Sequence, residues 1–385
     1  MMIILYISIG FLLYTSFILV RNLNDFKALQ KSNVPNSTKS PKVSICIPAR
    51  NEADVIEHCV TSALKQNYPN FEVLVLDDES TDGTTEILEK LSGIINNLVH
   101  LKGEDKPENW LGKPWACHQL SKAATGEFLI FIDADVWLEE DTIPKAVNEL
   151  SNFDAITVWP QQIVETFWEK QVIPLIYFAL FTLLPAKYVE RAPRWLPSSL
   201  RSKFAPLFAA ACGQFIAFNR TVYDKIGGHE SVKDQIIEDV ELAKNIKSGG
   251  LSLRMLHGAN SVYCRMYANH KDLWNGLRKN FFVGFGKNIV FFLAMAIMHL
   301  VVFLAPFLIF IYGFQINSSE LLITSSISIL IIFLQRATLN FIFKWDIYSS
   351  FTHVIGVLWF QALGVQCLGD FFMNRSVSWK GRKLD

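Results

Sequence analysis

A short apolar run that ends in two acidic residues constrains the fold of this chain more than any other stretch. Phe128–Ile132 is apolar throughout and partly aromatic and β-branched, which predicts a strand buried on both faces. Asp133 and Asp135 follow it. Ligands of open α/β sheets bind beyond the carboxyl ends of the strands, and alternation along an extended chain points both side chains the same way. The pair therefore suits a hard divalent cation, although a plain strand end followed by a helix cap has the same pattern.

Strands and helices alternate from residue 43 onward. Residues 43–47 and 72–76 predict two strands, each followed by apolar residues at helical spacing, with Asn51 as the cap of the first helix. Residues 98–101 predict a third strand. Because the links are short, the expected fold class is α/β, Rossmann-like, with a mostly parallel sheet and right-handed crossovers.

The N-terminus predicts a membrane anchor. Residues 1–20 are almost wholly apolar and uncharged, and basic residues come only after them. A signal peptide has its positive charges before the apolar run. The reversed order predicts an uncleaved anchor whose C-terminal side is cytoplasmic.

The C-terminal part contains three further apolar segments, at residues 289–314, 321–343 and 351–372. Each is long enough for a hydrocarbon core of about 30 Å, and Arg278, Lys279 and Lys287 place the start of the first in the cytoplasm. Three crossings would leave the basic C-terminus on the opposite side, against the positive-inside tendency. Either one segment does not cross, or the tendency fails here.

These segments predict a domain organisation in which residues 171–188, marginal for crossing, lie at the membrane interface. The expected parts are an anchor (1–21), a linker (22–41), a catalytic domain (42–285) with an interfacial insertion (171–205), membrane segments (286–375) and a basic cytoplasmic tail (376–385). The expected location is the cytoplasmic membrane, with the catalytic domain on the cytoplasmic side.

Composition narrows the range of partners. Basic and acidic residues are equal in number, at 36 each, so charge gives no argument for nucleic-acid binding. The six cysteines are scattered without a C-x-x-C spacing, which favours reduced thiols over a metal site and agrees with a cytosolic face.

Four acidic clusters follow strands or begin helices: Glu52, Asp77 with Asp78, Asp133 with Asp135, and Glu238 with Asp239. Chemistry on a nucleotide diphosphate needs carboxylates to hold a divalent cation, groups that recognise the base, and a general base. The clusters supply these groups. A phosphate loop of the G-x-x-x-x-G-K-[ST] type and a G-x-G-x-x-G fingerprint after the first strand are both absent from the sequence.

Five motifs in order resemble glycosyltransferase family 2, whose members are inverting enzymes of the GT-A fold that use nucleotide-sugar donors. The motifs are Pro48-Ala49-Arg50-Asn51-Glu52, Asp77-Asp78-Glu79-Ser80-Thr81-Asp82, Gly112-Lys113-Pro114-Trp115-Ala116, Asp133-Ala134-Asp135 and Glu238-Asp239. The loop at residues 110–116 and the Arg265-Met266-Tyr267 segment are similar to the membrane-bound branch that includes carotenoid (diaponeurosporenoate-type) and hopene-associated glycosyltransferases.

The resemblance implies a donor site. It places seven residues around the nucleotide sugar: Pro48, Arg50, Glu52, Asp77, Asp78, Lys113 and Asp133. Asp78, or Asp77, would hydrogen-bond the base, and Lys113 would approach the diphosphate. Asp133 and Asp135 would bind Mg²⁺ or Mn²⁺.

The resemblance also implies an acceptor side. Asp239, preceded by Glu238, would be the catalytic base that activates the acceptor oxygen. Gly213 and Gln214 would line the acceptor pocket, or would only bend a strand. Trp274 lies where processive members carry Q-x-x-R-W, a motif missing here, which favours transfer of a single sugar.

The expected function is therefore inverting, metal-dependent transfer of one sugar, with UDP-glucose as the expected donor, to a lipophilic acceptor in the bilayer such as a carotenoid or another terpenoid. The alternatives are transfer to polyprenyl phosphate or diacylglycerol, phosphoryl hydrolysis on the D-x-D strand, and a non-catalytic membrane scaffold with a vestigial domain. The expected partners are the nucleotide sugar, the acceptor and membrane lipids.

Overall fold

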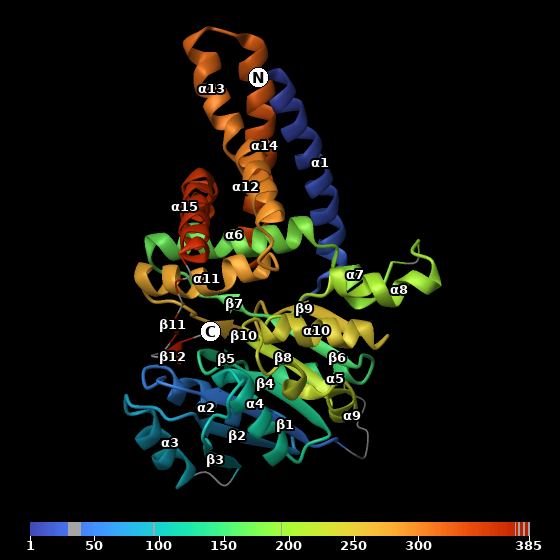
Figure 1. Ribbon diagram of the computed structural model, residues 1–385, viewed down its shortest axis with the longest axis vertical. Coiled ribbons are helices and arrows are strands. Elements are labelled where there is room, and N and C mark those ends of the chain that lie inside the picture. Colours follow the sequence, from blue (N-terminus) through green and yellow to red (C-terminus); the bar gives the residue numbers. More distant parts are fainter. Residues whose placement is uncertain are drawn as a thin grey trace. The chain divides into compact units, whose positions relative to one another are not determined.

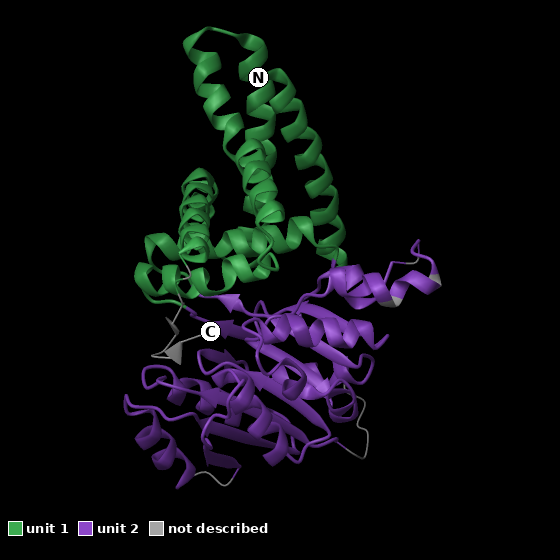
Figure 2. Cartoon of the chain, in the orientation of Figure 1, with its two compact units in different colours: residues 1–25, 164–185, 267–385 green, residues 26–163, 186–266 purple. Residues whose placement is uncertain are grey.

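The computed structural model describes residues 1–29, 40–94, 97–193, 195–373, 375, 378–379 and 382–383. Half of the predicted linker (residues 30–39) and most of the predicted basic tail lie outside the described residues. The chain forms two compact units (Figure 2). Unit 1 comprises residues 1–25, 164–185 and 267–385, and unit 2 comprises residues 26–163 and 186–266.

Unit 2 is built on one large sheet (Figure 1). Within the described residues it has seven strands, in the spatial order β3 (Leu98–Lys102), β2 (Phe71–Asp77), β1 (Val43–Ala49), β4 (Phe128–Ile132), β8 (Phe215–Asn219), β6 (Ala155–Trp159) and β9 (Leu253–His257). Strand β8 pairs antiparallel with both of its neighbours, and the other recorded pairings are parallel. The predicted mostly parallel α/β sheet is confirmed.

The strand sequences explain why this sheet is buried. All five residues of β4 are buried, as expected for a strand covered on both faces. Alternate residues of β1 join one hydrophobic core with apolar residues of α2 and β4. That core includes Val43, Ile45, Ile47, Cys59, Val60, Ala63, Ile130 and Ile132.

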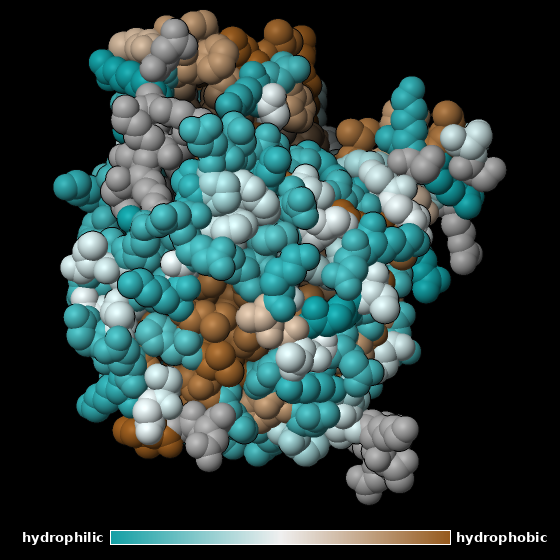
Figure 3. All heavy atoms as spheres, turned by 60° about the horizontal axis from the view of Figure 1, so that its bottom comes forward, coloured by the Kyte–Doolittle hydropathy of each residue, from teal (hydrophilic) through white to brown (hydrophobic). Residues whose placement is uncertain are grey.

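A small second sheet and the helices complete unit 2. The small sheet has the order β5 (Val136–Leu138), β10 (Val262–Cys264) and β7 (Gln161–Gln162). The helices are α2 (Ile56–Leu64), α3 (Thr84–Ser92), α4 (Gly112–Ala123), α5 (Thr142–Leu150), α7 (Ala186–Glu190), α8 (Ser198–Phe204), α9 (Arg220–Lys225) and α10 (Glu238–Ser248). The face of unit 2 turned forward in Figure 3 is largely hydrophilic, with a smaller hydrophobic area near its middle.

The predicted cap of the first helix of unit 2 is wrong. Helix α2 begins at Ile56 with Val55 at its N-cap position. Asn51 instead has a left-handed backbone (φ 52°), and its side-chain oxygen accepts a hydrogen bond from the Thr81 amide at 2.8 Å. Asn tolerates this backbone because its short polar side chain bonds locally, and here it links two loops instead of starting a helix.

Gly126, just before β4, allows a close approach to β1. A Cβ atom on this residue would lie 2.6 Å from the Ser44 backbone nitrogen and 2.8 Å from the Lys42 carbonyl oxygen. We expect Gly126→Ala to lower the free energy of unfolding by about 1–3 kcal/mol, because backbone must shift to admit the methyl group. Thermal unfolding of the solubilised protein measures this, with Gly93→Ala as the control because the added Cβ meets nothing nearer than 3.4 Å. Equal unfolding midpoints for the two variants would contradict the prediction.

Unit 1 is helical. Its helices are α1 (Met2–Asp25), α6 (Phe167–Leu183), α11 (His270–Gly284), α12 (Ile289–Phe303), α13 (Ala305–Gln315), α14 (Ser319–Ile342) and α15 (His353–Phe372). Across the described part of the chain, four helices are long and apolar enough to cross a membrane, by length and composition: 2–25, 289–315 (α12 with α13), 319–342 and 353–372. Helix α14 continues through Arg336, whose side chain is buried.

Hydrogen bonds join α1 to the rest of unit 1. The Asn22 amide nitrogen donates to the carbonyl oxygens of Phe181 (2.8 Å) and Leu184 (2.7 Å), at the end of α6. Ser8 donates to the Val302 carbonyl at 3.1 Å, and Gln335 donates to the Leu12 carbonyl at 3.0 Å. Figure 1 shows α6 and α11 lying across the direction of α1, α12 and α14.

Candidate functional site

The candidate site lies at one edge of the large sheet, wholly within unit 2. Strands β1, β2 and β4 run parallel, so their carboxyl ends meet at this edge. Strand β8 runs the opposite way, so the residues that precede it lie at the same edge. The sheet thereby brings together the acidic residues after β2 and β4 and the Gly213-Gln214 pair before β8.

The loops after β1 and β2 are joined to each other, as a nucleoside-binding wall would require. Arg50 Nη1 donates to the Asp78 carbonyl oxygen and pairs with Glu79 at 3.5 Å. The Glu52 amide donates to the Thr84 hydroxyl at 2.8 Å. Three of the predicted donor residues, Arg50, Glu52 and Asp78, therefore lie in one connected pair of loops.

Asp77 and Asp78 are both 4% exposed and play different parts in these loops. One oxygen of Asp77 accepts a hydrogen bond from the Ser80 amide at 3.0 Å, and the other accepts one from the Thr85 hydroxyl. Both oxygens of Asp77 thus hold the loop and the start of α3. Asp78 joins the loops through its backbone, since its amide donates to the Ala49 carbonyl oxygen at 2.8 Å and its carbonyl oxygen accepts from Arg50.

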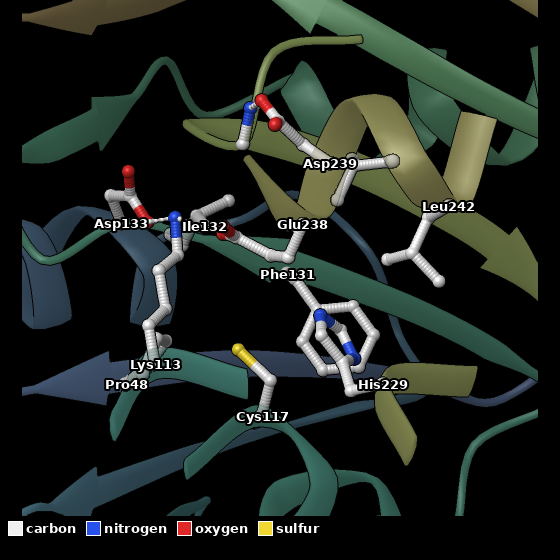
Figure 4. A pocket seen from close by; sticks show the side chains of 12 residues that line it. Pro48, Lys113, Cys117, Phe131, Ile132, Asp133, His229, Glu238, Asp239 and Leu242 are labelled. Carbon is white, nitrogen blue, oxygen red and sulfur yellow. Dashed lines mark hydrogen bonds and ion pairs between the residues drawn. The ribbon is translucent and has the colours of Figure 1, made fainter. Parts of the chain in front are cut away.

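Lys113 is the centre of the site (Figure 4). It lies in the first turn of α4, with Nζ 2.7 Å from Asp133 Oδ1 and 2.9 Å from Glu238 Oε1. Burial acts to lower the pKa of Lys113, but the carboxylates of Asp133 and Glu238 outweigh it and raise that pKa well above its usual value. A permanent positive charge therefore lies between the two acidic clusters, where a diphosphate would need it.

Asp239 has the environment of a general base. It lies in the first turn of α10, and its carboxylate accepts hydrogen bonds from the amides of Gly213 (2.6 Å) and Val240 (2.8 Å). Burial and the negative charge of Glu238 raise the pKa of Asp239 to about 6, while Lys113 opposes the shift. Such a pKa suits proton transfer near neutral pH.

Gly213 contacts both charged groups. A Cβ atom at this position would lie 3.0 Å from Lys113 Nζ and 3.2 Å from Asp239 Oδ2. A side chain here would crowd the pair, so the sequence places a glycine at this point. Gly213 therefore helps to form the site through its backbone.

The other two residues predicted on the acceptor side are Gln214, whose backbone lies at the same edge, and Trp274. The Gln214 side chain is buried, accepting from Gln162 at 2.7 Å and donating to the Cys264 sulfur at 2.9 Å, so it holds the interior together. Trp274 belongs to α11 of unit 1, where its ring packs on Trp359 at 5.0 Å between centroids.

The pocket also has lining residues that sequence reasoning did not single out: Cys117, Phe131, Ile132, Ile216, His229 and Leu242, beside the predicted Pro48 (Figure 4). His229 is 2% exposed, and its Nδ1 lies 2.7 Å from the Tyr223 hydroxyl. Burial lowers the pKa of His229 to about 3, so it is neutral in the pocket wall. In the sequence, His229 follows the Gly227-Gly228 pair. Two glycines predict a turn and do not indicate that the next residue lines a pocket.

Asp133 and Asp135 fit a divalent cation shared with a substrate. Both carboxylates lie near Cys264, whose thiol pKa is raised well above its usual value by burial first and then by their charges. No group of three or more His, Cys, Asp or Glu side chains capable of holding a metal occurs among the described residues. Mg²⁺ commonly uses one or two protein carboxylates together with substrate phosphates. The carboxylate oxygens fit such a shared ion, which would compete with the Lys113 ammonium for Asp133 Oδ1.

Comparisons with known proteins agree with this arrangement. The family Glycosyl transferase family 2 matches residues 44–227, and Glycosyl transferase family 21 matches residues 194–385. A 4,4'-diaponeurosporenoate glycosyltransferase of Staphylococcus haemolyticus is 26% identical over 73% of this chain and 71% of that protein. The Staphylococcus aureus (strain USA300) protein of the same name is 28% identical over 63% of this chain and 62% of its own length, which is less than two thirds.

A solved structure shares the fold. The mannosyltransferase PcManGT from Pyrobaculum calidifontis, in complex with GDP-Man and Mn²⁺, aligns with a TM-score of 0.54 over 97% of this chain and 99% of that chain, at 17% identity. The likeness is one of fold alone. With the family match, it shows that this chain carries a glycosyl transferase family 2 domain, over residues 44–227, on a GT-A-like fold.

Proposed function

We propose that this chain is a membrane-attached, inverting glycosyltransferase that transfers one sugar from a nucleotide sugar, with UDP-glucose as the first candidate, to a lipophilic acceptor such as a carotenoid carboxylate or hydroxyl or another terpenoid. The observation that carries the proposal is the position of Lys113, paired with Asp133 and Glu238 and next to Asp239, in a family 2 domain. The names of the relatives support a carotenoid acceptor.

The donor binds along the carboxyl edge of the sheet. Pro48, Arg50, Glu52 and Asp78 contact the nucleoside, and Lys113 binds the diphosphate. Bound Mg²⁺ or Mn²⁺, held by Asp133 and Asp135, supplies further positive charge for the leaving group. GDP-Man and Mn²⁺ in the mannosyltransferase structure support this class of donor and ion.

The acceptor reacts beside Asp239. The Asp239 carboxylate takes the proton of an acceptor hydroxyl, whose oxygen forms a bond to the anomeric carbon as the bond from that carbon to the diphosphate oxygen breaks. Attack from the face opposite the leaving group inverts the anomeric configuration. The electron pair leaves with the nucleoside diphosphate, whose charge Lys113 stabilises.

The domain limits belong to the same proposal. Residues 42–285 include the catalytic domain, residues 1–21 and 286–375 are the membrane parts, and residues 171–205 lie on the acceptor side at the membrane interface. The four candidate spans support attachment to the cytoplasmic membrane, with the catalytic domain facing the cytoplasm. A cytoplasmic tail at 376–385 requires in addition that one of the three C-terminal segments does not cross, because three crossings would put the tail on the opposite side. The missing Q-x-x-R-W motif supports transfer of a single sugar.

Donor binding tests the proposal. The solubilised protein is titrated by calorimetry with UDP-glucose, UDP-galactose, UDP-N-acetylglucosamine and GDP-mannose, with and without Mn²⁺. Mn²⁺-dependent binding of one nucleotide sugar, followed by transfer of its sugar to an extracted lipid, is the expected result. If the folded protein binds none of them, the transferase proposal fails and the scaffold alternative replaces it. Transfer only to polyprenyl phosphate or diacylglycerol would overturn the acceptor assignment alone.

The pH dependence of transfer follows from Asp239. The ionised carboxylate is the active base, so its fraction falls as the pH falls through the pKa of about 6. We expect kcat/KM for a hydroxyl acceptor to rise about tenfold per pH unit below that pKa and to level off above it. Lys113 lowers the pKa of Asp239, so the acid limb of Lys113→Met is expected at higher pH. An unchanged limb in that variant would show that another group controls the profile.

A further inference from the structure

Unit 1 contains a cavity that the chemistry at the sheet edge does not use. Its volume is about 540 Å³, within the range of roughly 300–1,000 Å³ typical of small-ligand sites. It lies among helices α6, α11, α12 and α15 of the same unit. The lining residues are Leu175, Ile176, Phe178, Ala179, Thr182, Leu183, Leu277, Asn280, Phe281, Gly284, Phe285, Phe292, Met295, Ala296, Met298, His299, Phe303, Phe360 and Gln361.

The wall of this cavity suits a hydrocarbon chain. None of the lining residues named above is Asp, Glu, Lys or Arg. Six are phenylalanines, and their rings pack on one another, as Phe281 does on Phe292 (5.5 Å) and Phe360 (5.4 Å). Aromatic faces and methionine thioethers are polarisable surfaces that pack closely on an extended apolar or conjugated ligand.

Two helices that line the cavity belong to the candidate membrane spans. Helix α12 is part of the 289–315 span, and α15 is the 353–372 span. A cavity lined by such helices is accessible to molecules dissolved in the bilayer more readily than to water-soluble ones. The occupant is therefore a lipophilic molecule.

We infer that this cavity binds the hydrocarbon body of the lipophilic acceptor. The inference rests on the proposed function for the identity of the occupant. An acyl chain of a bulk phospholipid has similar chemistry over part of its length, but its headgroup is charged and the lining offers no charged partner. The cavity therefore suits the apolar body of a ligand and offers no partner to a charged headgroup.

Gly284 gives a way to fill the cavity. It lines the cavity near the end of α11, and a Cβ atom there would meet no heavy atom within 4 Å. Gly284→Leu should therefore occupy ligand space without disturbing the packing. Gly10→Leu is the matched control, since Gly10 lies in helix α1 of the same unit, its Cβ also meets nothing within 4 Å, and it does not line the cavity.

Binding of cis-parinaric acid, a conjugated polyene fatty acid, tests the inference. Energy transfer from protein tryptophans to this probe reports protein-bound ligand in the detergent-solubilised full chain. We expect saturable binding that Gly284→Leu weakens by about tenfold and that Gly10→Leu leaves unchanged. Equal binding by all three proteins, or displacement by phosphatidylglycerol as effective as that by unlabelled polyene acid, would overturn the inference.

A parallel measurement separates this inference from the proposed function. UDP-glucose binding with Mn²⁺ is expected to be the same in Gly284→Leu as in the unchanged protein, while the KM for the acceptor rises. Normal acceptor KM in Gly284→Leu would reject the cavity and leave the transferase proposal standing. Specific polyene binding in a protein that binds no nucleotide sugar would reject the transferase proposal and its acceptor, and with them the identity assigned to the occupant.

Discussion

Asp239→Asn is expected to lower kcat for a hydroxyl acceptor by about 10²–10⁴-fold, the usual contribution of a positioned general base. The variant keeps the size of the side chain and one oxygen to accept from the Gly213 amide, which now donates at 2.6 Å, but it cannot take a proton. Transfer of radiolabelled sugar into the lipid phase measures kcat, and nucleotide-sugar binding is expected to persist because Asp239 is not assigned to the donor.

Glu241→Gln is the matched control for this variant. Glu241 lies in the same first turn of α10, but its carboxylate pairs with Lys244 at 2.6 Å, on α10 itself. We expect near-normal transfer from it. Equal loss in both variants would indicate damage to α10 and would remove the support for Asp239 as the base.

The acceptor class can be read from the same variant. A carboxylate acceptor arrives without a proton on its attacking oxygen, so Asp239→Asn should impair ester formation much less than ether formation. Full turnover by Asp239→Asn with a hydroxyl acceptor would contradict the assigned role.

Asp135→Ala is expected to abolish the effect of Mn²⁺ on donor binding. Removal of one of the two protein carboxylates should lower the affinity for Mn²⁺ by about a hundredfold, because even changes to groups around a metal ligand lower metal affinity by about 10–100-fold. Calorimetric titration with the nucleotide sugar, at several Mn²⁺ concentrations, measures the coupling. Metal-free binding through the nucleoside loops should be retained.

The control for Asp135→Ala is Asp141→Ala, which removes a carboxylate that pairs with Lys145 at 2.8 Å at the start of α5. It should bind the donor and Mn²⁺ normally. If Asp135→Ala also retains Mn²⁺-dependent binding, the D-x-D pair does not hold the ion and the metal assignment is wrong.

The sheet could be predicted from sequence because its signals are local. The apolar run at Phe128–Ile132 is a buried strand, and the carboxylates that follow it lie at the carboxyl edge of the parallel strands, as predicted. The apolar segments that became candidate spans were equally clear, because length and composition decide them.

Contacts between distant residues could not be predicted. Lys113 was assigned to a diphosphate, but its pairing with both Asp133 and Glu238 depends on how α4 and α10 pack against the sheet. Asn is a residue type that often caps helices. The Asn51 side chain instead accepts a hydrogen bond from the Thr81 amide in the neighbouring loop. Trp274 is close to the expected motif in sequence yet belongs to unit 1, because the chain changes unit near residue 267.

The hydrogen bonds of α1 have a consequence for how the protein is made. Synthesis runs from the N-terminus, so α1 leaves the ribosome long before Val302 and Gln335, whose backbone and side chain it bonds. Asn22 can bond the end of α6 once that helix is made, but Ser8 has no Val302 to bond until α12 is made, and Leu12 has no Gln335 until α14 is made. An unrelated hydrophobic helix in place of α1 could still serve as an anchor, but it would lack the hydrogen bonds that α1 forms with Val302 and Gln335.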